Sequence, residues 1–82
     1  MMTDIKVLHQ QDREQFVINI DEQQALLTYN LYDDRVVFTH TFVPDSLRGQ
    51  GLAEKLVRSG LSWANSANLN IEANCWYVQK FL

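Results

Sequence analysis

The chain has few of the residues that cross-link or interrupt a protein backbone. Among its 82 residues are one cysteine, one proline and three glycines. A single cysteine, Cys75, cannot form a disulfide within the chain, which excludes a disulfide-stabilised scaffold. The sequence also lacks an apolar run close to the roughly 20 residues that span a bilayer. Its first residues lack the basic and then apolar pattern of a secretion signal. We therefore expect a cytoplasmic protein that does not enter a membrane.

Basic residues are also scarce. Seven lysines and arginines face ten aspartates and glutamates, which gives a formal net charge of −3. The positive charges form no cluster, and nucleic-acid binding needs a basic face, so we expect no nucleic-acid partner. The two histidines and one cysteine do not have the spacing of metal ligands, so we expect no metal site. The composition, 46 % hydrophobic and 21 % charged, is that of one globular domain over residues 1–82.

The first half of the chain has the period-two pattern of strands. We predict strands over residues 5–9, 15–20, 25–32 and 35–43, separated by short polar breaks. In residues 35–43 both alternating sets are apolar or β-branched, which predicts a central strand covered on both sides. Its first set is Val36, Phe38, His40 and Phe42.

The second half begins with a helical pattern over residues 51–67. Gly60 lies in the apolar stripe of that helix, where it predicts close packing of helix against sheet. Asn68 is expected to end the helix in a left-handed conformation. A strand over residues 69–74 and a short helix over residues 75–82, capped by Asn74, complete the chain. The order predicts an α+β fold: a mixed, mostly antiparallel sheet of about five strands, one long helix and a short C-terminal helix.

A glycine-rich turn joins the strongest strand to the long helix. Gly49 and Gly51 stand where a helix N-terminus leaves N–H groups unpaired, which favours an anion such as a pyrophosphate. A P-loop requires lysine after the second glycine, but Leu52 follows Gly51. A dinucleotide-binding turn requires a third glycine where the chain has Glu54, and antiparallel strands precede the turn.

A third interpretation fits the turn and its neighbours. Arg48-Gly49-Gln50-Gly51-Leu52-Ala53 resembles the coenzyme A signature of the GNAT superfamily of N-acetyltransferases. His40-Thr41-Phe42-Val43-Pro44 before it and Asn74-Cys75-Trp76-Tyr77-Val78 after it resemble the small stand-alone GNAT-like proteins of roughly 90 residues. The resemblance extends from Ile5 onward and implies a single minimal GNAT-like domain that binds acetyl-CoA.

The resemblance implies a role for each part of the site. Main-chain amides of residues 48–53 would hold the pyrophosphate, and the strand edge at Phe42 and Val43 would pair with the pantetheine arm. The N–H of Val43 would polarise the thioester carbonyl. Arg48 either adds charge or is an ordinary loop arginine. The implied coenzyme site contains His40, Thr41, Phe42, Val43, Arg48, Gly49, Gln50, Gly51, Leu52, Ala53 and Asn74.

The implied chemistry is acetyl transfer to an amine whose identity the sequence does not give. Tyr77 would protonate the departing thiolate, or it is an aromatic packed over the sheet. Cys75 would lie at a helix N-terminus, which lowers a thiol pKa, and would accept acetyl or line the thioester pocket. His40 is a candidate base, although a histidine on an interior strand is more often a core residue. The alternative function is a coenzyme A or acyl-CoA binding module without catalysis. Open sheet edges allow a monomer or a weak homodimer.

Overall fold

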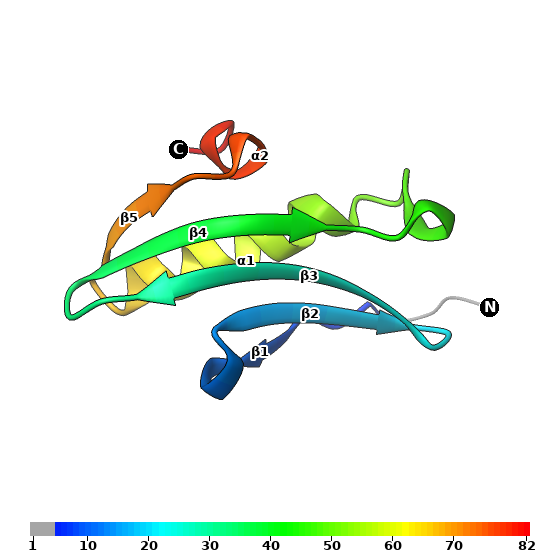
Figure 1. The fold of residues 1–82 in the computed structure, drawn as a ribbon, viewed down its shortest axis with the longest axis horizontal. Coiled ribbons are helices and arrows are strands. Elements are labelled where there is room, and N and C mark those ends of the chain that lie inside the picture. The colour runs from blue at the N-terminus through cyan, green and yellow to red at the C-terminus, as the bar shows by residue number, and fades with distance from the viewer. Residues whose placement is uncertain (1–4) are drawn as a thin grey trace.

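The computed structural model describes residues 5–82, which form a sheet of five strands with one long helix along one face (Figure 1). Two short 3₁₀ turns, η1 and η2, lie in the connections. In chain order the elements are β1 (Leu8–Gln10), η1 (Gln11–Arg13), β2 (Gln15–Ile20), β3 (Gln23–Leu31), β4 (Arg35–Phe42), η2 (Asp45–Leu47), α1 (Leu52–Ser66), β5 (Asn70–Ala73) and α2 (Trp76–Gln79).

The strands lie in the sheet in the same order as in the sequence. Strands β1 to β4 form an antiparallel meander, and β5 pairs with β4 in parallel. Parallel neighbours need a crossover connection, and α1 supplies it. The predicted α+β fold with a mixed, mostly antiparallel sheet is confirmed.

The core lies between α1 and the sheet. Leu56, Val57 and Ala64 of α1 are fully buried against Phe38, Leu27 and other residues of the strands. A Cβ atom on Gly60 would stand 2.9 Å from Cε1 of Phe38 and 3.1 Å from Cδ2 of Leu27. The close packing that Gly60 predicted is therefore confirmed.

An extra residue in β4 reverses the side on which its side chains lie. Tyr29 pairs with Phe38 but Thr28 pairs with His40, so Thr39 is the extra residue of a β-bulge. Phe38 is fully buried under α1, whereas Phe42 lies on the other face and is 45 % exposed. The prediction that Val36, Phe38, His40 and Phe42 share one face is therefore wrong.

The face of the sheet opposite α1 has no helix among the described residues (Figure 1). We call it the open face. The prediction that residues 35–43 are covered on both sides is wrong, because α1 covers one face of β4 and the side chains of His40 and Phe42 on the other face are exposed. His40 is exposed there, so the interpretation of His40 as a core residue is also wrong.

The ends of the elements differ from the predictions by a few residues. The first strand is Leu8–Gln10 and not residues 5–9, and α2 ends at Gln79 instead of residue 82. The N-cap of α2 is Cys75, so Asn74 does not have the predicted capping role. Asn68, with a φ of 58°, follows α1 in the predicted left-handed conformation. No helix within residues 5–82 is long and apolar enough to cross a membrane.

Candidate functional site

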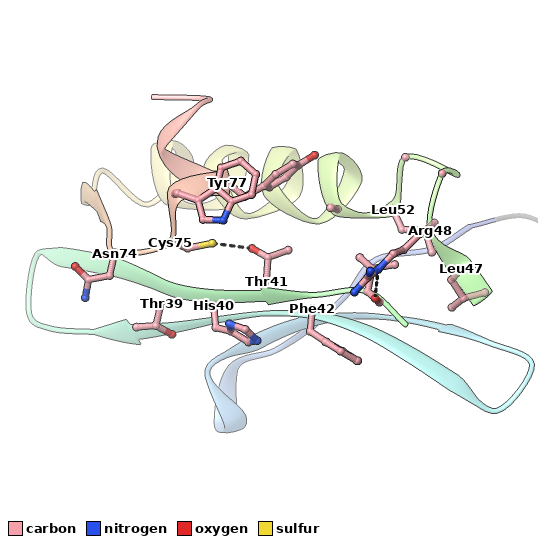
Figure 2. A pocket seen from close by; sticks show the side chains of 15 residues that line it. Thr39, His40, Thr41, Phe42, Leu47, Arg48, Leu52, Asn74, Cys75 and Tyr77 are labelled. Carbon is pink, nitrogen blue, oxygen red and sulfur yellow. Dashed lines mark hydrogen bonds between the residues drawn. The ribbon is translucent and has the colours of Figure 1, made fainter. Parts of the chain in front are cut away.

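The site begins where β4 and β5 stop pairing. Their last pair is Phe38 with Ala73, and the N–H of Asn74 then donates to the Phe38 carbonyl at 2.9 Å. Beyond this point β4 continues to Phe42, while the other chain segment turns into α2. The space between them is a cavity of about 710 Å³, open to solvent (Figure 2). The chain thus forms a fork with its free main-chain edge on β4.

The glycine turn closes the far end of this cavity. Gly49 and Gly51 have φ values of 83° and 75°, a conformation that residues with a Cβ rarely adopt. Arg48 fixes the turn to the end of β4, because its Nε donates to the Val43 carbonyl at 3.2 Å (Figure 2). Its guanidinium also lies 3.0 Å from the carboxylate of Asp45. Arg48 therefore stabilises the turn, and the carboxylate of Asp45 partly neutralises its positive charge.

The turn presents a series of unpaired N–H groups. The first main-chain hydrogen bond of α1 runs from Lys55 to the Gly51 carbonyl at 3.1 Å. No main-chain carbonyl within residues 5–82 accepts a hydrogen bond from the N–H groups of residues 49–54. No side chain caps the helix at Gly51, and nothing lies within 4 Å of the position that a Cβ atom would take on either glycine. These features fit an anion the size of a pyrophosphate, because the donors are free and nothing blocks the approach.

Cys75 lies near the base of the fork, opposite β4. Its Sγ is 3.5 Å from Oγ1 of Thr41 (Figure 2). Burial raises the pKa of the Cys75 thiol, but hydrogen bonds from the Thr41 hydroxyl and from the main chain of Val78, Tyr77 and Thr41 outweigh it, so the net pKa is lowered. The predicted direction is correct, and the cause is this set of hydrogen bonds, since α2 is only one turn long.

Tyr77 lies on the helix side of the fork. Burial and the negative charge of Glu54 raise the pKa of its hydroxyl, and the positive charge of Arg58 opposes them in part. Its ring contacts that of Phe81, with centroids 5.4 Å apart. At neutral pH the hydroxyl therefore keeps its proton and can donate it.

Thr41 and its neighbours on β4 lie on opposite sides of the strand. Thr41 points toward Cys75, whereas His40 and Phe42 point toward the open face (Figure 2). The bulge at Thr39 produces this arrangement, because without it Thr41 would lie on the open face. Asn74, at the base of the fork, is exposed.

Twelve of the thirteen residues predicted for the site line the same cavity. The exception is Gln50, whose side chain lines a separate hollow with Ile20 and Ser46 on the other side of the turn. Thr39, Leu47 and Trp76 also line the cavity and were not predicted. Trp76 is 70 % exposed. Within residues 5–82 no three potential ligands gather to hold a metal ion.

The fold and the cavity define a small α+β protein with unpaired N–H groups in a glycine turn at a helix N-terminus, and with a cleft between β4 and the segment that follows β5. The profile of the GCN5-related N-acetyl-transferase family matches residues 15–82. The chain belongs to this family.

Relatives agree with this assignment. Protein NATD1 of Bos taurus is 36 % identical over 81 residues, which cover 95 % of this chain and 72 % of the relative. Protein NATD1 of Homo sapiens is 35 % identical over the same length, with the same coverage. The solution structure of a GCN5-like protein from Staphylococcus aureus superposes with a TM-score of 0.72 at 30 % identity, covering 98 % of this chain and 79 % of that one. The predicted membership of the small GNAT-like proteins is thereby confirmed.

Proposed function

We propose that the protein is an acetyl-CoA-dependent N-acetyltransferase. The observation that carries the proposal is the pairing of two features in one cavity: free N–H groups at residues 49–54 at one end, and the Cys75 thiol beside Thr41 at the other. Acetyl-CoA suits this arrangement, because its pyrophosphate can meet the free N–H groups while its thioester lies near Cys75. The single cysteine in the cavity suits a reducing compartment, so we also propose a cytoplasmic location.

The coenzyme would bind along the free edge of β4. The N–H groups of residues 49–54 bind the pyrophosphate, and the glycines let it approach the main chain. Past Phe38, the β4 edge that faces β5 has no partner strand, so the pantetheine amides can pair with it as an added strand would. The N–H of Val43 does not suit the role that the resemblance implies for it, because Val43 adjoins Arg48 at the pyrophosphate end of the cavity and Cys75 lies at the other end.

Bound acetyl-CoA supplies an activated acyl group to an amine. In the transfer a C–N bond forms, the C–S bond breaks, and the amine loses one proton while the thiolate gains one. Tyr77 is the group suited to donating to the thiolate, because its raised pKa keeps it protonated. Cys75 lies beside the thioester end of the cavity and shapes it.

Binding and turnover test the proposal in sequence. Calorimetry with acetyl-CoA, coenzyme A and NAD should show binding of the first two and none of the third. A panel of amines with acetyl-CoA should then release free thiol above background. Tyr77→Phe should lower turnover by about 100-fold, the usual size of a proton-transfer contribution, while leaving acetyl-CoA affinity within about threefold.

A coenzyme A or acyl-CoA binding module without catalysis is the second candidate. The cavity lining favours it in one respect: none of the fifteen lining residues is a carboxylate that could act as a base. A binding module predicts tight acetyl-CoA binding, no thiol release with any amine, and identical behaviour of Tyr77→Phe. A turnover defect in that variant excludes this candidate.

A further inference from the structure

The two sides of the fork present different side chains to an acceptor amine. On the helix side, Tyr77 packs against Phe81, and the guanidinium of Arg58 lies over the Phe81 ring at 5.6 Å. On the other side of β4, His40 is exposed and Phe42 is 45 % exposed, and both line the cavity (Figure 2). The acceptor therefore approaches across the open face.

The strand register shows what the acceptor meets there. Three rows of side chains cross the open face beside the cavity. None of their residues is an aspartate, glutamate, lysine or arginine. The first row is Leu8, Val17, Leu26 and Phe42; the second is Gln10, Gln15, Thr28 and His40; the third is Asn19 and Gln24.

The first row is apolar from the edge of the sheet to the cavity. Val17, in the middle of this row, is fully buried and lies outside the core cluster beneath α1. Leu8 at one end is 47 % exposed and Phe42 at the other is 45 % exposed. An apolar group on the acceptor can therefore lie next to Phe42 and remain in contact with Leu26.

Negative charge around the fork is already paired. Asp45 pairs with Arg48 at 3.0 Å, Glu54 with Arg58 at 2.7 Å, and Glu72 with Arg35 at 3.2 Å. The side chains that line the cavity include Arg48 and no carboxylate. An acceptor that arrives as an ammonium ion, or with further positive charge, gains no counter-charge here.

Only a neutral amine can attack a thioester, so the protonation state of the arriving amine decides which acceptors can react. The lining of the cavity contains no carboxylate that could take a proton from an ammonium group. At pH 7.5 about one third of an α-amino group is neutral, against roughly 0.1 % of a lysine side chain.

These observations point to one class of acceptor. Resting on the acetyltransferase function proposed above, we propose that the acceptor is a weakly basic amine on an uncharged, partly apolar body, and that a peptide α-amino group is its simplest form. The amine meets the thioester beside Thr39 and His40, and the adjoining apolar group lies against Phe42 and Leu26. The amine arrives in its neutral form.

One synthetic peptide tests the choice of amine, because Leu-Ala-Ala-Lys amide carries an α-amine and a lysine amine together. With acetyl-CoA at pH 7.5, mass spectrometry should find acetylation of the α-amine in at least about 30-fold excess. Raising the pH to 9.5 should reduce that excess by roughly 30-fold, because the lysine amine gains neutral form and the α-amine is already neutral.

Two results of this assay overturn the inference in different ways. Equal or greater acetylation of the lysine amine at pH 7.5 would reject the proposed acceptor class and leave the acetyltransferase function intact. Acetylation of neither amine by protein that binds acetyl-CoA in calorimetry would reject the acceptor class and count against catalysis itself.

A pair of leucines on β3 tests the apolar contact. Leu26→Ser should raise the KM for Leu-Ala-Ala-Lys amide severalfold while leaving kcat and acetyl-CoA affinity unchanged, because Leu26 adjoins Phe42 but does not line the cavity. Leu31→Ser is the matched control, since Leu31 is 46 % exposed at the other end of β3. An equal KM effect in both variants, or none in Leu26→Ser, would exclude the open face as the acceptor surface.

Discussion

The layer under α1 and the fork beside it use glycine for opposite purposes. In the layer, Gly60 allows α1 to approach Phe38 so closely that even a methyl group would collide. In the fork, Gly49 and Gly51 have open space around them and a backbone conformation that other residues rarely adopt. One glycine removes volume from a closed interface, and the other two shape an open one.

The comparison shows how a chain of 82 residues keeps both a core and a site. Small domains bury a limited fraction of their surface, so most apolar contact must be concentrated in one layer. Here that layer is α1 against β2, β3 and β4. The fork then stays open because β5 ends after four residues and pairs no further along β4. Changes in the layer should therefore affect stability, and changes in the fork should affect binding.

The largest expected effect is loss of coenzyme binding in Gly51→Asp. A carboxylate at the turn repels the pyrophosphate and occupies the space that it needs, so acetyl-CoA affinity should fall at least about 100-fold, or about 2.7 kcal/mol. The φ of 75° adds strain of about 1 kcal/mol to the fold, which should persist. Isothermal calorimetry and circular dichroism measure the two effects.

Gln50→Asp is the matched control for this charge. Its side chain lies on the other side of the turn, toward Ser46 and Ile20, so the same net charge should weaken binding by less than about 10-fold. Equal acetyl-CoA affinity of the two variants would contradict the prediction. It would mean that the coenzyme does not bind on the side of the turn that faces the cavity.

The second prediction concerns the layer, where a substitution should lower stability and leave coenzyme binding unchanged. Gly60→Ala gains helix propensity of about 1 kcal/mol but forces Phe38 and Leu27 to move, and overpacking of a core typically costs about 1–3 kcal/mol. We expect a net loss of about 1 kcal/mol in urea unfolding and unchanged acetyl-CoA affinity. Ser62→Ala, on the exposed side of α1, should gain a few tenths of a kcal/mol instead. A stabilised Gly60→Ala would show that the layer is looser than its contacts indicate.

The layer was also the part that sequence patterns predicted best. Periodicity identified every major element, and the single Gly60 in an apolar stripe predicted its close packing. The bulge at Thr39 could not be found, because nothing in a run of β-branched and aromatic residues marks where one residue is left unpaired. His40 and Phe42 were consequently assigned to the face of Val36, although they lie on the opposite one.

In the fork, motif resemblance outperformed pattern. It brought together segments that lie more than thirty residues apart, such as Thr41 and Cys75, which periodicity alone cannot do. It missed Thr39, which also lines the cavity, and it could not tell that Gln50 lines a separate hollow. A turn motif specifies main-chain geometry, so it leaves side-chain direction open.

The third prediction concerns the thiol at the base of the fork. Thr41→Val removes the hydroxyl that hydrogen-bonds Cys75, so the pKa of that thiol should rise. The midpoint of its pH-dependent alkylation by iodoacetamide should move upward, and the rate at pH 7.5 should fall severalfold. Thr39→Val removes a hydroxyl from the same strand that bonds Thr28 instead, and it should leave the midpoint unchanged. Equal shifts in the two variants would mean that strand disturbance and not the hydroxyl controls the thiol.

The smallest expected effect is the pH dependence of stability that His9 causes at the edge of the layer. His9 stacks on Phe16, and its Nε2 shares a hydrogen bond of 2.7 Å with the Tyr29 hydroxyl. Burial lowers the pKa of His9 in the folded state. Because the unfolded chain then binds more protons, stability should be constant above about pH 7 and should fall as the pH drops below the unfolded value of about 6.5, with a slope under about 1.4 kcal/mol per pH unit. Urea unfolding between pH 7.5 and 5 measures this, and the difference between the protein and His9→Gln isolates it from the carboxylates. If acid destabilises His9→Gln as much as the unaltered protein, burial does not lower the pKa of His9, and the layer is not closed at this edge.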